Sequence, residues 1–234
     1  MDLQQTKDTF MEVVGARRSV RHYIPDKVSE EDLRMIMESA RQAPSGENAQ
    51  PWRFIIVKAT ENKEFLSKVS KMGSGRRFTG EYLSKQMQAR MVEQDRLRYA
   101  DKAAQEEDEA KQQAAYKKLT SGEVSAFVKD PDVVVIVIGK KEVWDLPFDT
   151  SAAIENMLLT VTALNLGACW VIAPCIDVRD ELKLKEYFKI PEEYKAISII
   201  SIGATSRMPR PRPRLPLEEI VFTEKFGDAY YKQS

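Results

Sequence analysis

Two arginine clusters, near opposite ends of the chain, are the groups best suited to bind an anion. The first spans residues 17–21 (RRSVR) and the second spans 210–216 (RPRPRLP). A guanidinium is planar and can bind two phosphate oxygens at once, and a serine adds a short hydroxyl donor. The prolines fix φ near about −65°, which lowers the entropy lost when the neighbouring arginines bind an anion. On spacing alone, a solvated loop or an interaction tail fits these clusters as well as an anion site does.

A third segment, residues 43–54 (APSGENAQPWRF), combines turn-forming residues with amide side chains and one aromatic. It lies between an expected helix and an expected strand. Taken alone, it also fits an ordinary helix-to-strand loop in which Trp52 is anchored in the core.

Composition and charge exclude several other kinds of chemistry. The chain has 36 Lys and Arg residues against 36 Asp and Glu residues, and this balance argues against a nucleic-acid or membrane-surface binder. With His22 as the single histidine of 234 residues, a His-rich metal site is excluded. No P-loop or dinucleotide-binding glycine motif is present. Cys169 and Cys175 lack the C-x-x-C spacing, so we expect two buried, reduced thiols. With no signal-like N-terminus and no apolar run of about 20 residues, the sequence predicts a soluble, cytoplasmic protein without a membrane partner.

The order of expected elements predicts an α+β or mixed α/β fold in a single domain, residues 1–234. Strands are expected at 53–58, 132–139, 168–172 and 196–203. Helices are expected at 8–16, from Ser29 as N-cap to Pro44, and at 62–72, 150–166 and 178–188, with a glycine-rich basic turn at 73–77.

Residues 81–121 differ from the rest of the chain because they contain neither Gly nor Pro and are rich in helix-forming residues. The apolar stripe of this stretch is thin, which predicts a projecting helical insertion at about 80–122. A substrate lid and a dimer-stabilising arm are both open interpretations of it.

Taken together and in order, four segments resemble the FMN-dependent nitroreductase family. Residues 17–21 resemble its R-R-S-x-R opening, and 44–52 resemble its P-S-x-x-N-x-Q-P-W loop. Residues 149–170 are similar to its central helix and following strand, and 210–216 to its closing R-P-R-P-R-L-P. The resemblance implies a central mixed, mostly antiparallel sheet flanked by helices. It also implies an intertwined homodimer with an FMN at each of two subunit interfaces.

The resemblance also implies a role for each matching residue. One group holds the FMN phosphate or lies at the same end of the cofactor: Arg17, Ser19, Arg212 and Arg214, with Arg18 beside them. Arg21 faces the pyrimidine edge of the flavin. A third group reaches the FMN of the other subunit: Pro44, Ser45 and Asn48. A fourth lies near the flavin ring, with a main-chain N–H close to N5: Trp170, Ile172 and Ala173.

The implied reaction is a ping-pong transfer of hydride from NADH or NADPH, through flavin N5, to an electron-poor acceptor such as a nitroaromatic or a quinone. No catalytic nucleophile and no metal are needed, because the flavin carries the chemistry. One alternative is a flavin-dependent dehalogenase or dehydrogenase of an aromatic metabolite, gated by a lid over 80–122. The related iodotyrosine deiodinases carry a Thr where Ala173 precedes Pro174 here, which argues against dehalogenation. A non-enzymatic scaffold that binds an acidic partner or RNA is the third interpretation.

Overall fold

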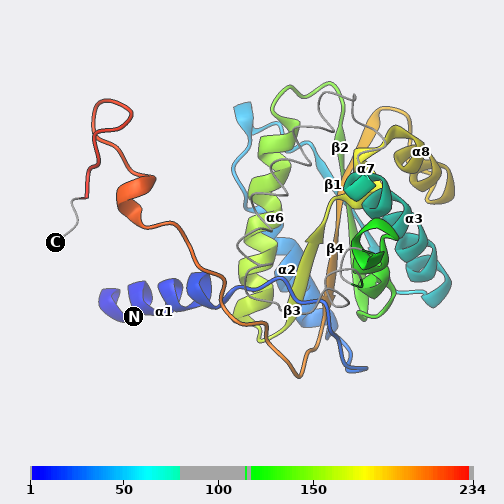
Figure 1. Ribbon diagram of the computed structural model, residues 1–234, viewed down its shortest axis with the longest axis horizontal. Coiled ribbons are helices and arrows are strands. Elements are labelled where there is room, and N and C mark those ends of the chain that lie inside the picture. Colours follow the sequence, from blue (N-terminus) through cyan, green and yellow to red (C-terminus); the bar gives the residue numbers. More distant parts are fainter. Residues whose placement is uncertain (1, 80–113, 115–116, 232–234) are drawn as a thin grey trace.

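The computed structural model describes residues 2–79, 114 and 117–231, shown in Figure 1. Most of the insertion expected at 80–122 therefore lies outside the described residues. The helices are α1 (Leu3–Ala16), α2 (Glu30–Arg41), α3 (Thr60–Thr79), α6 (Leu146–Ala163), α7 (Ala173–Ile176) and α8 (Val178–Tyr187). The strands are β1 (Trp52–Val57), β2 (Val133–Lys140), β3 (Gly167–Val171) and β4 (Tyr194–Gly203), and three short 3-10 helices are η1 (Gly46–Asn48), η2 (Glu123–Lys129) and η3 (Leu217–Glu219).

The four strands form one sheet in the order β1-β2-β4-β3, and each neighbouring pair is antiparallel. Trp52 pairs with Gly139 at one edge and Val171 with Ile199 at the other. An isolated parallel bridge joins Ser19 to Ala168 in β3. This bridge places the first arginine cluster against the edge strand of the sheet.

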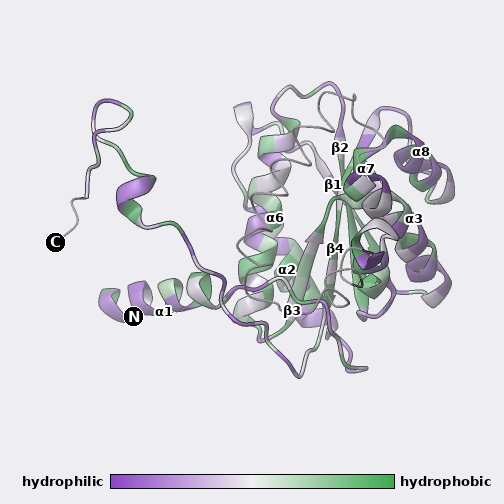
Figure 2. Cartoon of the chain, viewed as in Figure 1, coloured by the Kyte–Doolittle hydropathy of each residue, from purple (hydrophilic) through white to green (hydrophobic). Residues whose placement is uncertain are grey.

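Helices cover both faces of the sheet, and β2 is buried between them. α2 and α6 lie on one face, while α3, η2, α7 and α8 lie on the other (Figure 1). Successive residues of β2 alternate between the two cores: Val133, Val135 and Val137 face α2 and α6, whereas Val134, Ile136 and Ile138 face α3 and α8. Apolar residues follow the strands and the inward sides of the helices in Figure 2. The prediction of an α+β fold with a mostly antiparallel sheet is confirmed.

Capping explains where several helices begin. Ser29 caps α2 as expected, because its Oγ accepts a hydrogen bond from the Asp32 main-chain N–H at 2.9 Å. The helix expected from residue 8 begins at Leu3, since the Asp2 carboxylate accepts from the Gln4 main-chain N–H at 3.1 Å. α6 begins at Leu146 rather than at residue 150, with Pro147 in its first turn, where its missing N–H costs nothing.

The prediction of a glycine-rich turn at 73–77 is wrong, because α3 continues through it to Thr79. Close packing explains the two glycines. A Cβ on Gly73 would lie 2.0 Å from the Ala173 main-chain oxygen, and one on Gly75 would lie 3.0 Å from that of Thr120. Ser74 Oγ lies 2.6 Å from Ser125 Oγ in the same interface. Tertiary contacts with α7 and with the chain before η2 therefore outweigh the low helix propensity of glycine.

α1 and the C-terminal segment extend from the body toward the same side of the molecule (Figure 1). None of the residues of α1 is buried. Large apolar side chains are exposed on both, with Met11 63% and Phe226 93% exposed. Such surfaces are typical of regions that are covered by another chain.

Replacing Gly73 by alanine tests the close approach of α3 to α7. Alanine in an ordinary helix position is favoured over glycine by up to about 1 kcal/mol. We expect Gly73→Ala to lower the free energy of unfolding by about 1–3 kcal/mol instead, since the methyl group overlaps the main chain of Ala173. Urea unfolding followed by circular dichroism measures this change.

Gly15→Ala is the matched control, because a Cβ there has no atom within 4 Å. It should leave stability unchanged or raise it. A Gly73→Ala protein as stable as the Gly15→Ala protein would contradict the close helix packing.

Candidate functional site

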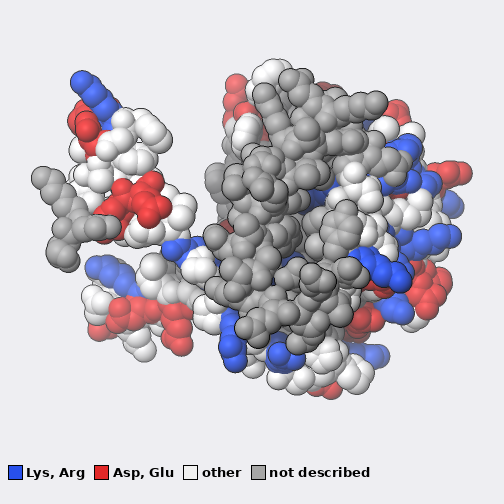
Figure 3. Space-filling model, in the orientation of Figure 1, with Lys and Arg blue, Asp and Glu red and all other residues white. Residues whose placement is uncertain are grey.

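The two arginine clusters, almost two hundred residues apart in sequence, border one cleft of about 1100 Å³. Seven of its thirteen lining residues are arginines, and none of these described residues is acidic. The lining residues are Val14, Gly15, Arg17, Arg18, Ser19, Arg21, His22, Arg207, Pro209, Arg210, Pro211, Arg212 and Arg214. Positive and negative side chains are by contrast interspersed on the right-hand side of the molecule in Figure 3. The cleft is therefore a local concentration of positive charge on a chain with no net charge.

Main-chain hydrogen bonds to the sheet hold the first cluster at the cleft. The Val20 N–H donates to the Ala168 oxygen at 2.8 Å, and the Ile24 N–H donates to the Ala204 oxygen at 3.0 Å. Val20 is 1% exposed and packs where Gly167 leaves room, since a Cβ on that glycine would lie 2.7 Å from the valine Cγ1. With Val20 facing the core, its neighbours Ser19 and Arg21 face outward and are exposed.

The second cluster lies in the C-terminal segment that follows β4. Thr205 donates its hydroxyl to the main-chain oxygen of His22 at 2.8 Å, which ties the beginning of the C-terminal segment to the first cluster. His22 thus has a structural contact through its backbone. Among the described residues, no group of three or more His, Cys, Asp or Glu could hold a metal ion. Arg17 lies 3.6 Å from Glu155, and this carboxylate lies outside the cleft lining.

A second cavity, of about 740 Å³, adjoins the cleft and shares Arg21 and Arg212 with it. The end of β3 and the start of α7 form one wall, with Trp170, Ile172 and Ala173. Nine of the predicted site residues are therefore gathered in two connected spaces: Arg17, Arg18, Ser19, Arg21, Trp170, Ile172, Ala173, Arg212 and Arg214.

A tyrosine and two thiols in and near the cavity walls are kept in their neutral forms. The ring of Phe127 stacks on Tyr23 with centroids 6.5 Å apart, and the Arg21 guanidinium lies 5.8 Å from the Phe127 centroid. Burial raises the pKa of Tyr23, whose hydroxyl donates to the Val20 oxygen at 2.8 Å. Burial likewise raises the pKa of Cys169 and of Cys175, both free thiols, as the sequence predicts. Neither cysteine is therefore suited to act as a nucleophile.

The loop with Pro44, Ser45 and Asn48 lies apart from both spaces within one chain. It is fixed near the N-terminus of α6, where the Gly46 N–H donates to Asp149 Oδ1 at 3.1 Å. α6 has 18 residues and is about 27 Å long, and the Ser19 bridge lies beyond its other end. Positive φ values at Glu47 and Asn48 (50° and 57°) mark a strained loop, a feature that is common at binding sites.

Comparison with known proteins decides the family. A family model described as the Nitroreductase family matches residues 14–204. The chain belongs to the nitroreductase family. This confirms the resemblance to the family, with three of the four segments inside the matched residues, and makes the chain an oxidoreductase of that family.

Individual relatives and solved structures are similar to most of this chain. A putative NADH dehydrogenase/NAD(P)H nitroreductase of Archaeoglobus fulgidus is 28% identical over 82% of this chain and 83% of its own length. An FMN-dependent nitroreductase structure from Clostridium difficile gives a TM-score of 0.65 at 22% identity, covering 92% of this chain and 99% of that one. An iodotyrosine deiodinase bound to FMN and 3-iodo-L-tyrosine gives 0.65 at 22% identity, covering 92% and 98%. At this identity the structural matches establish a shared fold.

Some residues that line the second cavity are not among the site residues predicted from the sequence. The missed residues of the second cavity include Arg77, Phe78 and Lys118. Arg77 is the one for which a signal exists, since it belongs to the basic pair that follows Gly75, but it was expected in a solvated turn. The actual helix places it on a wall of the cavity. No helix in the described part of the chain is long and apolar enough to cross a membrane.

The arginine-lined cleft should respond to a small anion. In the flavin-free protein, inorganic phosphate should relieve repulsion between the guanidinium groups and raise the melting temperature. Phosphate at ten times its dissociation constant contributes about 1.4 kcal/mol, or roughly 3–6 °C for a chain of this size. Differential scanning calorimetry at constant ionic strength measures the shift.

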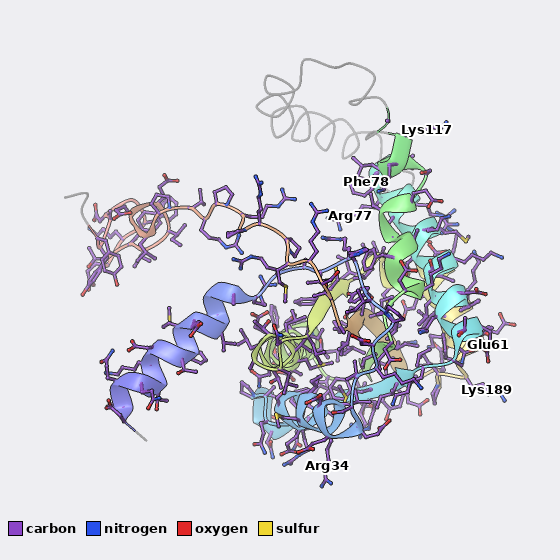
Figure 4. The ribbon with its side chains drawn as sticks, turned by 90° about the horizontal axis from the view of Figure 1, so that it is seen from below. Arg34, Glu61, Arg77, Phe78, Lys117 and Lys189 are labelled. Atoms are coloured by element: carbon purple, nitrogen blue, oxygen red, sulfur yellow. The ribbon has the colours of Figure 1, made fainter. Side chains whose placement is uncertain are left out.

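The double variant Arg212→Gln/Arg214→Gln should lose most of this shift. Arg34→Gln is the control, since Arg34 is exposed on α2 and lies away from the cleft (Figure 4). An equal phosphate response in all three proteins would exclude the cleft as the anion site.

Proposed function

We propose that the chain is an FMN-dependent oxidoreductase that transfers hydride from NADH or NADPH to an electron-poor acceptor, such as a nitroaromatic or a quinone, in a ping-pong cycle. The observation that carries this proposal is the junction of the two spaces. One is a cleft rich in arginine and the other is a cavity with apolar and aromatic walls. FMN has the matching division between a phosphate and a flat ring.

The cleft fits the phosphate end of FMN. Arg17, Ser19, Arg212 and Arg214 would hold the phosphate, with Arg18 at the same end. A doubly charged phosphate offers three oxygens to donors of this kind, and bidentate contacts to arginine are among the strongest hydrogen bonds in proteins. The prolines of the second cluster support the assignment, because they reduce the conformational freedom that binding must remove.

The second cavity fits the flavin ring. Arg21 lines both spaces, so it suits the pyrimidine edge, where a guanidinium stabilises the negative charge that develops on reduction. Trp170, Ile172 and Ala173 would lie along the ring and present a main-chain N–H near N5. When bound, FMN supplies the hydride-accepting and hydride-donating centre. The residues of the chain bind it, orient it and keep one face open to donor and acceptor in turn.

A homodimer follows from the same assignment. Pro44, Ser45 and Asn48 line neither space of their own chain, which supports contact with the FMN of the other subunit. The exposed apolar side chains of α1 and of the C-terminal segment also support an intertwined pair, since a second copy would cover them.

A dehalogenase or dehydrogenase of an aromatic metabolite is the second candidate, and its support is the shared fold with the iodotyrosine deiodinase. Ala173 next to Pro174 provides no hydroxyl near the flavin, so hydride transfer to an electron-poor acceptor agrees better with the cavity. The lid that this candidate requires falls on residues outside the described part of the chain. The scaffold interpretation loses its support, because the chain belongs to an oxidoreductase family.

The visible spectrum tests the proposed function. The purified protein should be yellow, should bleach anaerobically when NADH or NADPH is added, and should regain its colour when a nitroaromatic or a quinone follows. A flavin-containing protein that neither nicotinamide bleaches would overturn the reductase assignment.

Removing one guanidinium tests the phosphate contacts. Arg214→Ala should weaken FMN binding by about 1.5–3 kcal/mol, roughly 10- to 150-fold in the dissociation constant, because a charge-assisted hydrogen bond is lost. Fluorescence titration of the flavin-free protein with FMN gives the value. Arg34→Ala should bind FMN like the unaltered protein. Equal affinities for all three would remove Arg214 from the site.

A further inference from the structure

The wall of the second cavity includes two cations that the proposed FMN contacts do not use. Arg77, at the end of α3, and Lys118, just before η2, line this cavity together with Phe78. Both charged side chains are exposed and Phe78 is half-buried. Figure 4 shows Arg77 and Phe78 at the same end of α3, on the side where the C-terminal segment passes.

Helix geometry explains why Arg77 faces the flavin side of the cavity. Gly73 contacts the main chain of Ala173, one of the residues proposed to lie along the ring. Arg77 is four residues further on, so it occupies the same face of α3, one turn beyond that contact. The close contact with Ala173 that requires glycine at position 73 thus also fixes the face of α3 on which Arg77 lies.

The described residues around the two cations supply no compensating charge. Four basic residues line the cavity, namely Arg21, Arg77, Lys118 and Arg212. None of the described residues that line it is acidic. Within the described part of the chain, neither Arg77 nor Lys118 forms an ion pair, whereas the neighbouring Arg76 pairs with the buried carboxylate of Asp180. Arg76 therefore serves the packing of α3 against α8, and the charge of Arg77 is available to a ligand.

We propose that the acceptor is an aromatic molecule that carries a carboxylate or a similar anionic group, which Arg77 and Lys118 bind while its ring lies beside Phe78. The inference rests on the proposed function and names the acceptor class for that same site. A cavity of about 740 Å³ is within the range of small-molecule sites, and the flavin ring takes part of it. The space left suits one small aromatic acceptor.

The electron donor is a less suitable source of the anion. In NADPH the 2′-phosphate is separated from the nicotinamide by two riboses and a pyrophosphate. A nicotinamide stacked on the flavin would therefore place that phosphate well beyond a cavity of this size. An anionic group attached directly to the aromatic ring of an acceptor stays within reach of both cations.

A pair of probes of nearly equal shape tests the proposal. The holoprotein is reduced with dithionite, so the test does not depend on reaction with a nicotinamide. Its reoxidation is then followed by stopped flow with 4-nitrobenzoate and with 4-nitrobenzamide, and the ratio of the two second-order rate constants is compared among variants. Differences in intrinsic reactivity between the probes cancel in this comparison.

We expect Arg77→Gln and Lys118→Gln each to lower the benzoate-to-benzamide ratio about three- to fivefold, and the double variant to lower it about tenfold or more. Lys117→Gln is the matched control, because Lys117 is the adjacent exposed lysine and does not line the cavity. Calorimetric titration of the oxidised holoprotein with benzoate, which does not react, should show the same order of affinities without turnover. FMN content should be equal in all variants.

An unchanged ratio in the double variant, with FMN content intact, would overturn the proposal. So would a loss confined to bleaching by NADPH relative to NADH, because the cations would then bind the donor. Failure of the unaltered protein to bleach with either nicotinamide would instead reject the proposed reductase function, a result that is separate from the dithionite experiment.

Discussion

Mutual repulsion among guanidinium groups is the constraint on which the site depends. Seven arginines line a cleft that has no acidic group among its described residues, and such an arrangement is unfavourable without an anion. The fold supplies the stability that holds them there, through hydrogen bonds from residues 20 and 24 to β3 and to the end of β4. The sheet, buried on both faces, is the rigid support that keeps these segments together, as expected for a preformed anion site.

The same strands also set the boundary between charge and apolar surface. β3 has the arginine cluster beside its first residues and the cavity wall at its last, so a single strand of five residues connects the two ends of the proposed cofactor. Because β3 is hydrogen-bonded to β4 along its length, neither end moves independently of the core. A hydride carrier needs such fixed placement more than it needs acid–base groups, which agrees with a site whose cysteines are buried and whose single histidine contacts the chain through its backbone.

Much of the fold was predictable because the signals are local. Ser29 before an apolar helix and the continuous apolar run of β2 each predict an element that the structure contains. The residues around the arginines were predictable for a different reason, since their order along the chain resembles a known family. The turn expected at 73–77 failed because Gly73 and Gly75 are explained by contacts with Ala173 and Thr120, which are distant in sequence. Local propensity carries no information about such contacts.

The error in predicting a turn matters for function, because the helical conformation of residues 73–77 determines where the Arg77 side chain lies. In a glycine-rich turn, the exposed Arg77 would be free to sample many directions, and its charge would face solvent. In α3, Gly73 is held against α7 and Arg76 is held by Asp180, so the helix that leads into residue 77 is fixed at two points just before it. A side chain whose backbone is fixed loses less entropy when it binds an anion. The packing of Gly73 and Gly75 therefore affects function as well as stability, because it fixes the backbone of Arg77, the residue proposed to select the acceptor.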